Sequence, residues 1–94
     1  MSNEIICYAL FDNKGKKYDT PFYCNDNLFA KRHFHMLAKK PGNLISTFLK
    51  DFDLIKLGSF NLESGEYKPD NEIICTGKQM QIILNKLNKE ANNE

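Results

Sequence analysis

The chain has 94 residues, enough for one hydrophobic core and too few for a multidomain enzyme. Hydrophobic residues make up 41% and charged residues 27%, a balance that is typical of folded globular proteins and excludes wholesale disorder. The net charge is only +1, but residues 12–40 carry seven cations against three carboxylates, and residues 51–72 carry six carboxylates against two lysines. We expect a single α+β domain over residues 1–91 and a frayed tail over 92–94.

The cysteines and the first residues indicate a reduced, cytoplasmic protein. Cys7, Cys24 and Cys75 have no C-x-x-C spacing, so a disulfide framework and a zinc site are both disfavoured. The first four residues lack the pattern of a signal peptide, and no apolar run reaches the roughly 18 residues that a membrane span needs. We therefore expect no metal, no cofactor and no membrane partner.

The first predicted element is a strand over residues 4–11, which is apolar on both of its sides. This pattern is typical of a central strand that is covered on each face, by helices or by another subunit. Residues 12–15 (DNKG) are a turn signal, and residues 18–24 are expected to return as a second, short strand. Pro21 places that strand at an edge or a bend.

A helix is predicted over residues 27–40, because Asn25 and Asp26 can cap its start and Pro41 with Gly42 ends it. At about 100° per residue, one arc of this helix is apolar and the opposite arc is basic. A basic arc is either a solvated outer face or a contact for nucleic acid. The apolar arc comprises Phe29, Ala30, Phe34, Met36, Leu37 and Ala38, and the basic arc comprises Lys31, Arg32, His35 and Lys39.

The second half of the chain predicts a short helical turn over 43–50, a strand over 51–60 and a hairpin turn over 61–66 that returns from Tyr67. A further short strand is expected over 71–75, and Thr76 with Gln79 forms a capping-box pattern that starts a final helix. The fold class is therefore α+β, with a small, mainly antiparallel sheet of four to five strands and two helices. We expect the helix over 27–40 on one face, and the final helix on the other face or at an edge. The apolar stripe of the final helix comprises Met80, Ile83, Leu84, Leu87 and Ala91.

Catalytic patterns are weak, and we do not expect an enzyme. Asp51 and Asp53 lie two apart on a strand and could present carboxylates on one face to a metal, but acidic residues are common at the start of a strand. His33 and His35 diverge by about 200° on a helix, which opposes joint metal coordination. Cys24 precedes a helix start that could lower its pKa, but the sequence offers it no base.

Lysines and aromatic residues are adjacent in the first hairpin, where Lys14, Lys16 and Lys17 precede Tyr18, Phe22 and Tyr23. Cations on phosphates and aromatic rings under bases are the usual means of holding single-stranded nucleic acid. The alternative interpretation is a solvated turn followed by aromatic residues that pack into the core.

Several short motifs in a fixed order carry a family resemblance. They are residues 8–12 (YALFD), 20–22 (TPF), 30–34 (A-x-R-x-F), 51–60 (D-F-x-L-x-x-L-G-x-F) and 64–66 (SGE). In this order and spacing the chain resembles, over residues 5–69, the small nonstructural protein of gokushovirus-type microviruses, which are single-stranded DNA phages. The resemblance implies an accessory protein in the cytoplasm of the infected bacterial host that assists viral single-stranded DNA synthesis or packaging. It carries over no catalytic residues.

Resemblance and charge pattern together predict binding of single-stranded DNA, provided that the hairpin cations and the helix cations converge on one surface. The rival interpretation is a protein interaction module that forms a homodimer or joins phage or host replication proteins without nucleic acid. The predicted phosphate contacts are Lys14, Lys16, Lys17, Lys31, Arg32 and Lys39, and the predicted stacking residues are Tyr18 and Tyr23.

Overall fold

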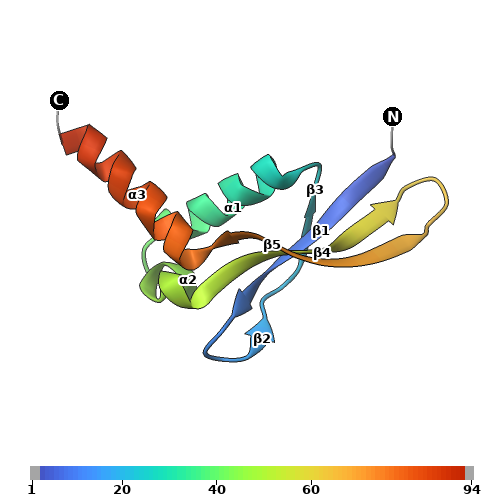
Figure 1. Cartoon of the computed structure of the whole chain (residues 1–94), viewed down its shortest axis with the longest axis horizontal. Helices are drawn as coiled ribbons and strands as arrows, with labels where there is room; N and C mark the ends of the chain where they lie inside the picture. The colour runs from blue at the N-terminus through green and yellow to red at the C-terminus, as the bar shows by residue number, and fades with distance from the viewer. Residues whose placement is uncertain (1–2, 93–94) are drawn as a thin grey trace.

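A computed structural model describes residues 3–92 of the chain, with the side chains of residues 3–89. These residues form one antiparallel sheet of five strands with two long helices, so the expected α+β class is confirmed (Figure 1). The strands are β1 (Glu4–Asp12), β2 (Lys17–Tyr18), β3 (Phe22–Cys24), β4 (Phe52–Asn61) and β5 (Tyr67–Thr76). The helices are α1 (Asn27–Lys39), the short α2 (Leu44–Thr47) with a 3-10 turn over Leu49–Asp51, and α3 (Gly77–Asn92).

The strand order is β2-β1-β4-β5, and β3 also pairs with β1. β1 is the central strand that its two apolar sides predict. The expected return strand over 18–24 is split into β2 and β3 around Pro21, because proline has no amide proton to donate to a ladder. The two expected strands from Tyr67 and over 71–75 are one continuous strand, β5.

All helices pack on one face of the sheet. The core beneath them contains Tyr8 and Leu10 of β1, Phe34 of α1, Leu54 of β4 and Met80 of α3. The expectation that α3 could cover the second face is therefore wrong. The reason is that α3 follows β5 without a loop, and a Cβ on Gly77 would overlap the carbonyl oxygens of Leu49 and Phe52, so only glycine allows this close approach.

α1 begins where the sequence predicts, with the Phe29 amide donating to the Asp26 carboxylate at 3.0 Å. Its contact with the sheet is narrower than the predicted arc, because only Ala30, Phe34 and Ala38 are buried, at a spacing of one turn. Phe29 and Met36 are exposed, which corrects their assignment to the core side. His35, assigned to the solvated arc, is half-buried.

The capping box of α3 is confirmed in both directions. The Thr76 amide donates to Gln79 Oε1 at 2.8 Å, and the Gln79 amide donates to Thr76 Oγ1 at 3.1 Å. Met80 is buried and Leu84 packs partly buried against the core, but Leu87 is 44% exposed. α3 thus docks by its first turns and then projects from the domain (Figure 1). The side chain of Ala91 and the tail residues 93–94 lie outside the described part of the chain.

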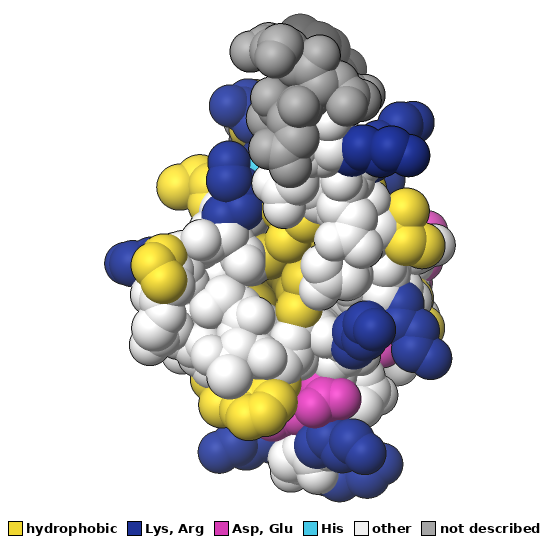
Figure 2. All heavy atoms as spheres, turned by 90° about the vertical axis from the view of Figure 1, so that its left-hand side faces the viewer, with side chains coloured by type: hydrophobic (Ala, Val, Ile, Leu, Met, Phe, Trp, Pro, Cys, Tyr) yellow, Lys and Arg dark blue, Asp and Glu magenta, His cyan; other side chains and the backbone are white. Residues whose placement is uncertain are grey.

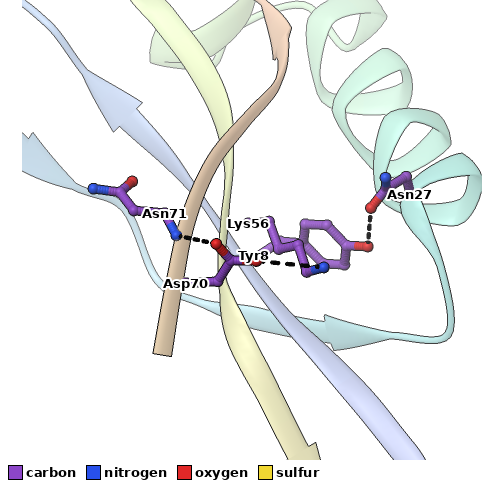
Figure 3. A network of polar contacts seen from close by, with 5 residues as sticks. All are labelled: Tyr8, Asn27, Lys56, Asp70 and Asn71. Atoms are coloured by element: carbon purple, nitrogen blue, oxygen red, sulfur yellow. Dashed lines mark hydrogen bonds and ion pairs between the residues drawn. The ribbon is translucent and has the colours of Figure 1, made fainter. Parts of the chain in front are cut away.

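Figure 3 shows one polar contact between the sheet and α1 and one between two strands of the sheet. The buried Tyr8 hydroxyl donates to Asn27 Oδ1 at the start of α1, at 2.6 Å. Lys56 of β4 pairs with Asp70 of β5 at 3.6 Å, which adds a cross-strand ion pair beside the hydrogen-bonded ladder. Tyr8 therefore anchors α1 to the central strand.

Candidate nucleic-acid interface

The second face of the sheet carries no helix among the described residues. Cys7, Ala9 and Ile55 are buried there, outside the core beneath the helices. Residues directly opposite one another in a ladder point to the same face, so the strand register defines this surface, which we call the open face. Its members are Ile5, Cys7, Ala9, Phe11, Tyr18, Tyr23, Asp53, Ile55, Gly58, Phe60, Tyr67, Pro69 and Ile73.

Aromatic side chains dominate the exposed part of the open face. Tyr18 is 47% exposed, Tyr23 52% and Tyr67 42%. Tyr18 meets Phe11 edge to face, with 4.8 Å between the ring centres. Tyr67 lies opposite Phe60 in the β4–β5 ladder. The face therefore presents flat, partly exposed rings at two places, near β2 and around Cys7.

The second aromatic group is built around the Cys7 thiol. Tyr23 lies opposite Cys7 in the β1–β3 ladder, and a hydrogen bond with this thiol is the main cause that raises the pKa of Tyr23. Burial is the main cause that raises the pKa of Tyr67, followed by the influence of Cys7 and Tyr23. Gly58 provides the room for the Tyr67 ring, because a Cβ there would overlap it. Both phenols thus stay neutral at physiological pH and would not repel a phosphate.

The hairpin lysines lie near carboxylates: Lys17 borders a hollow with Asp12 and Asp19, and Lys14 borders another with Asp12 and Asp51. The Asp12 carboxylate accepts the Lys14 amide at 3.0 Å, and Asp53 accepts Asn13 Nδ2 at 3.0 Å and the Gly77 amide at 3.2 Å. Figure 2 shows basic and acidic side chains together at the lower end of the molecule. The hairpin therefore offers cations for phosphate contacts without a strong positive field.

The helix cations lie elsewhere. Lys31 borders a hollow with Ile82 and Ile83 of α3, and Lys39 borders another with Leu84 and Leu87. Arg32 is exposed on the same helix. α1 covers the face opposite to Tyr18 and Tyr23, so the helix cations do not share a face with these two rings, and the convergence of the two basic sets stays a prediction.

The two predicted stacking residues, Tyr18 and Tyr23, lie on the same face of the sheet. Phe22 faces the helices and stacks on Tyr8, with 5.9 Å between the ring centres. The sequence did not predict that Tyr67 and Phe60 belong to the open face. Alternation along each strand could have placed them on one side, but only the register shows that this side is the open one.

The surroundings of two weak catalytic candidates, Cys24 and His33, are defined in the structure. Burial is the main cause that raises the pKa of the Cys24 thiol, and the Asp26 carboxylate adds to it, so the thiol is not activated by the helix start. The His33 ring packs against Phe22, with 4.3 Å between the ring centres. Within residues 3–92 no group of three His, Cys, Asp or Glu is placed to hold a metal ion. No described helix has the length and apolar character to cross a bilayer.

The comparison with known families covers most of the domain. The model of the family described as Phage ORF5 protein matches residues 5–80, from β1 through the first turn of α3. No curated protein and no solved structure matches the chain. The match extends the resemblance past residue 69 and confirms a small phage protein. The chain therefore belongs to the Phage ORF5 protein family.

Proposed function

We propose that this phage protein binds single-stranded DNA on the open face of its sheet and assists viral DNA synthesis or packaging in the host cytoplasm. The observation that carries the proposal is the set of exposed rings at Tyr18, Tyr23 and Tyr67 on a sheet face that the described helices leave uncovered. Antiparallel sheets with helices on one face and aromatic rings on the other are a recurring platform for unpaired bases.

Stacking is expected to supply most of the affinity. Each stacked base contributes roughly 1 to 3 kcal/mol in known single-strand binders, and it does so with little sequence preference. Lys14 and Lys16, in the hairpin turn before Tyr18, are the proposed phosphate contacts, whereas Lys17 pairs with Asp12 and points to the helix side. The α1 cations Lys31, Arg32 and Lys39 are left out of this interface, because they lie on the helix side of the sheet.

Fluorescence anisotropy with a labelled oligo-dT tests the proposal. We expect binding at low salt that Tyr23→Ala weakens by roughly 5- to 150-fold, the loss of one stacked base. The log-log dependence on salt should have a slope of about −1.4 or shallower, because at most two lysines neutralise phosphates at about 0.7 each. Replacing Lys14 and Lys16 by Gln should flatten this slope.

The matched control is Phe29→Ala, which removes another exposed ring but from the outer side of α1. It should bind oligo-dT as the unmodified chain does. Equal losses in Phe29→Ala and Tyr23→Ala, or no binding at low salt, would contradict the proposal. In the second case the open face is a surface for a protein partner, as the rival interpretation of the sequence predicts.

A further inference from the structure

A second surface of the molecule lies apart from the open face, between α1 and α3. The C-terminal end of α1 and the projecting part of α3 enclose a hollow of about 300 Å³, lined by Ala38, Lys39, Leu84, Leu87 and Asn88. Figure 2 shows apolar side chains at the floor of a hollow on this side of the molecule, with Lys and Arg side chains around it. We call it the helix hollow.

The two helices that form the helix hollow carry a net positive charge, and Glu90 near the end of α3 is their one carboxylate. Residues 27–40 and 77–89 contain seven lysines or arginines and no Asp or Glu. Two copies that met through this same surface would bring like charges together around a small apolar contact. A partner for the helix hollow should therefore combine an apolar side chain with carboxylates.

The turn between β4 and β5 has this composition. Leu62 is 63% exposed at its tip, next to Glu63 and near Glu66. The turn is held in shape, because Asn61 Oδ1 accepts the amides of Glu63 and Ser64 at 2.9 and 3.0 Å. Its backbone is tied to the sheet by the Leu62 amide, which donates to the Asn3 carbonyl at 2.7 Å. A preformed turn loses little conformational entropy on binding.

We infer that the β4–β5 turn of one copy docks into the helix hollow of the next, with Leu62 on Leu84 and Leu87 and with Glu63 and Glu66 near the surrounding lysines. The two surfaces lie at opposite ends of the molecule, whose longest dimension is 50 Å (Figure 1). A contact between two different surfaces at opposite ends does not close on itself, so copies add head to tail in an open series. This contact is independent of nucleic acid.

The test is sedimentation velocity of the full chain without DNA, over about 10 μM to about 1 mM, because a contact this small is expected to be weak. The mean mass should rise with concentration without reaching a plateau at the dimer, and should fall as salt increases. Leu62→Asp and, separately, Leu87→Asp should each weaken association at least about tenfold. The control is Leu28→Asp, at an exposed apolar position of α1 outside the helix hollow, and it should associate as the unmodified chain does.

Mixing the two defective variants separates this contact from other assemblies. Leu62→Asp keeps an intact hollow and Leu87→Asp an intact turn, so an equimolar mixture should form dimers that grow no further. Circular dichroism of each variant checks that the fold is retained. A chain that stays monomeric throughout, a closed dimer, or association that Leu62→Asp leaves unchanged would overturn the inference; the last two results would instead indicate pairing through α3.

Discussion

Tyr8 shows how one side chain joins the sheet to α1. Its ring is fully buried and stacks on Phe22, while its hydroxyl donates to Asn27 at the first residue of the helix. A buried hydroxyl that keeps a hydrogen bond avoids the cost of desolvation without a partner. Tyr8 therefore holds β1, β3 and α1 in one arrangement and fixes which face of β1 remains open.

Stability should fall at alkaline pH because of Tyr8. Burial, followed by the nearby Cys24 and Asp26, raises the pKa of Tyr8 to about 12 from the ordinary value of 10.0. The folded chain thus holds this proton more tightly than the unfolded chain, so the contribution is complete below pH 10 and is lost as the pH rises toward 12. Urea denaturation between pH 8 and pH 11 should show a decrease of about 1 kcal/mol, roughly half of what the full shift from pH 10 to pH 12 represents.

Tyr8→Phe is the control for this pH dependence. It removes the ionisable group and the hydrogen bond to Asn27, so we expect a loss of about 1 kcal/mol at pH 8 and a shallower decrease above pH 10. Tyr23 and Tyr67 leave some alkaline dependence in the variant, because their pKa values are also raised. An alkaline decrease of equal size in both proteins would assign the effect to other groups.

The start of α3 shows a conflict between local propensity and packing. Gly77 is the first residue of the helix, and a Cβ there would overlap the backbone carbonyl oxygens of Leu49 and Phe52. Alanine is the better helix former by about 1 kcal/mol, so propensity alone predicts that Gly77→Ala stabilises the chain. Backbone atoms cannot move aside as a flexible side chain can, so packing predicts the opposite sign.

We expect Gly77→Ala to lower the free energy of unfolding by about 1 to 3 kcal/mol, measured by urea denaturation at neutral pH. Lys78→Ala is the matched control, because the next residue of the same helix is exposed and its substitution should change stability by less than about 0.5 kcal/mol. A Gly77→Ala chain as stable as the unmodified one would mean that α3 shifts freely against the 3-10 turn.

Local signals predict the elements of this fold better than their arrangement. The cap at Asp26, the capping box at Thr76 and the turn at Gly65, whose φ is 76°, act within a few residues, so the sequence alone identifies them. The side of the sheet that α3 takes depends on the approach of Gly77 to Leu49 and Phe52, which no pattern within the helix encodes.

The same distinction explains which residues of the predicted interface share a face of the sheet. Lys17 and Tyr18 are neighbours in β2, but the register pairs Tyr18 with Phe11 on the open face and Lys17 with Asp12 on the helix side, because consecutive strand residues point to opposite faces. Helix cations such as Lys31 were joined to them only by shared charge, and charge does not fix position in space. The contact of Tyr23 and Tyr67 with Cys7 requires the pairing of β1 with β3 and β4 and of β4 with β5, which is a property of the whole sheet.

At the scale of the whole molecule, the three surfaces have different roles. The open face with its rings occupies the sheet, the helix hollow lies at one end, and the acidic β4–β5 turn lies at the other (Figure 1). If copies join head to tail, each open face is presented at a regular interval to the same strand of DNA. Binding to one copy then raises the effective concentration of the next, so long DNA should be bound cooperatively.

Leu62→Asp separates DNA binding by a single copy from the cooperation between neighbouring copies. On an oligo-dT that is long enough for one copy, the variant and the unmodified chain should bind equally, because Leu62 lies at the tip of the turn and outside the open face. On an oligo-dT several times longer, the unmodified chain should bind more tightly and with a steeper titration, whereas the variant should keep its short-oligonucleotide affinity per site. Anisotropy titrations with both lengths measure this difference. Weaker binding of the variant to the short oligonucleotide would place the turn in direct contact with DNA, and equal steepness on the long one would show that the copies bind independently.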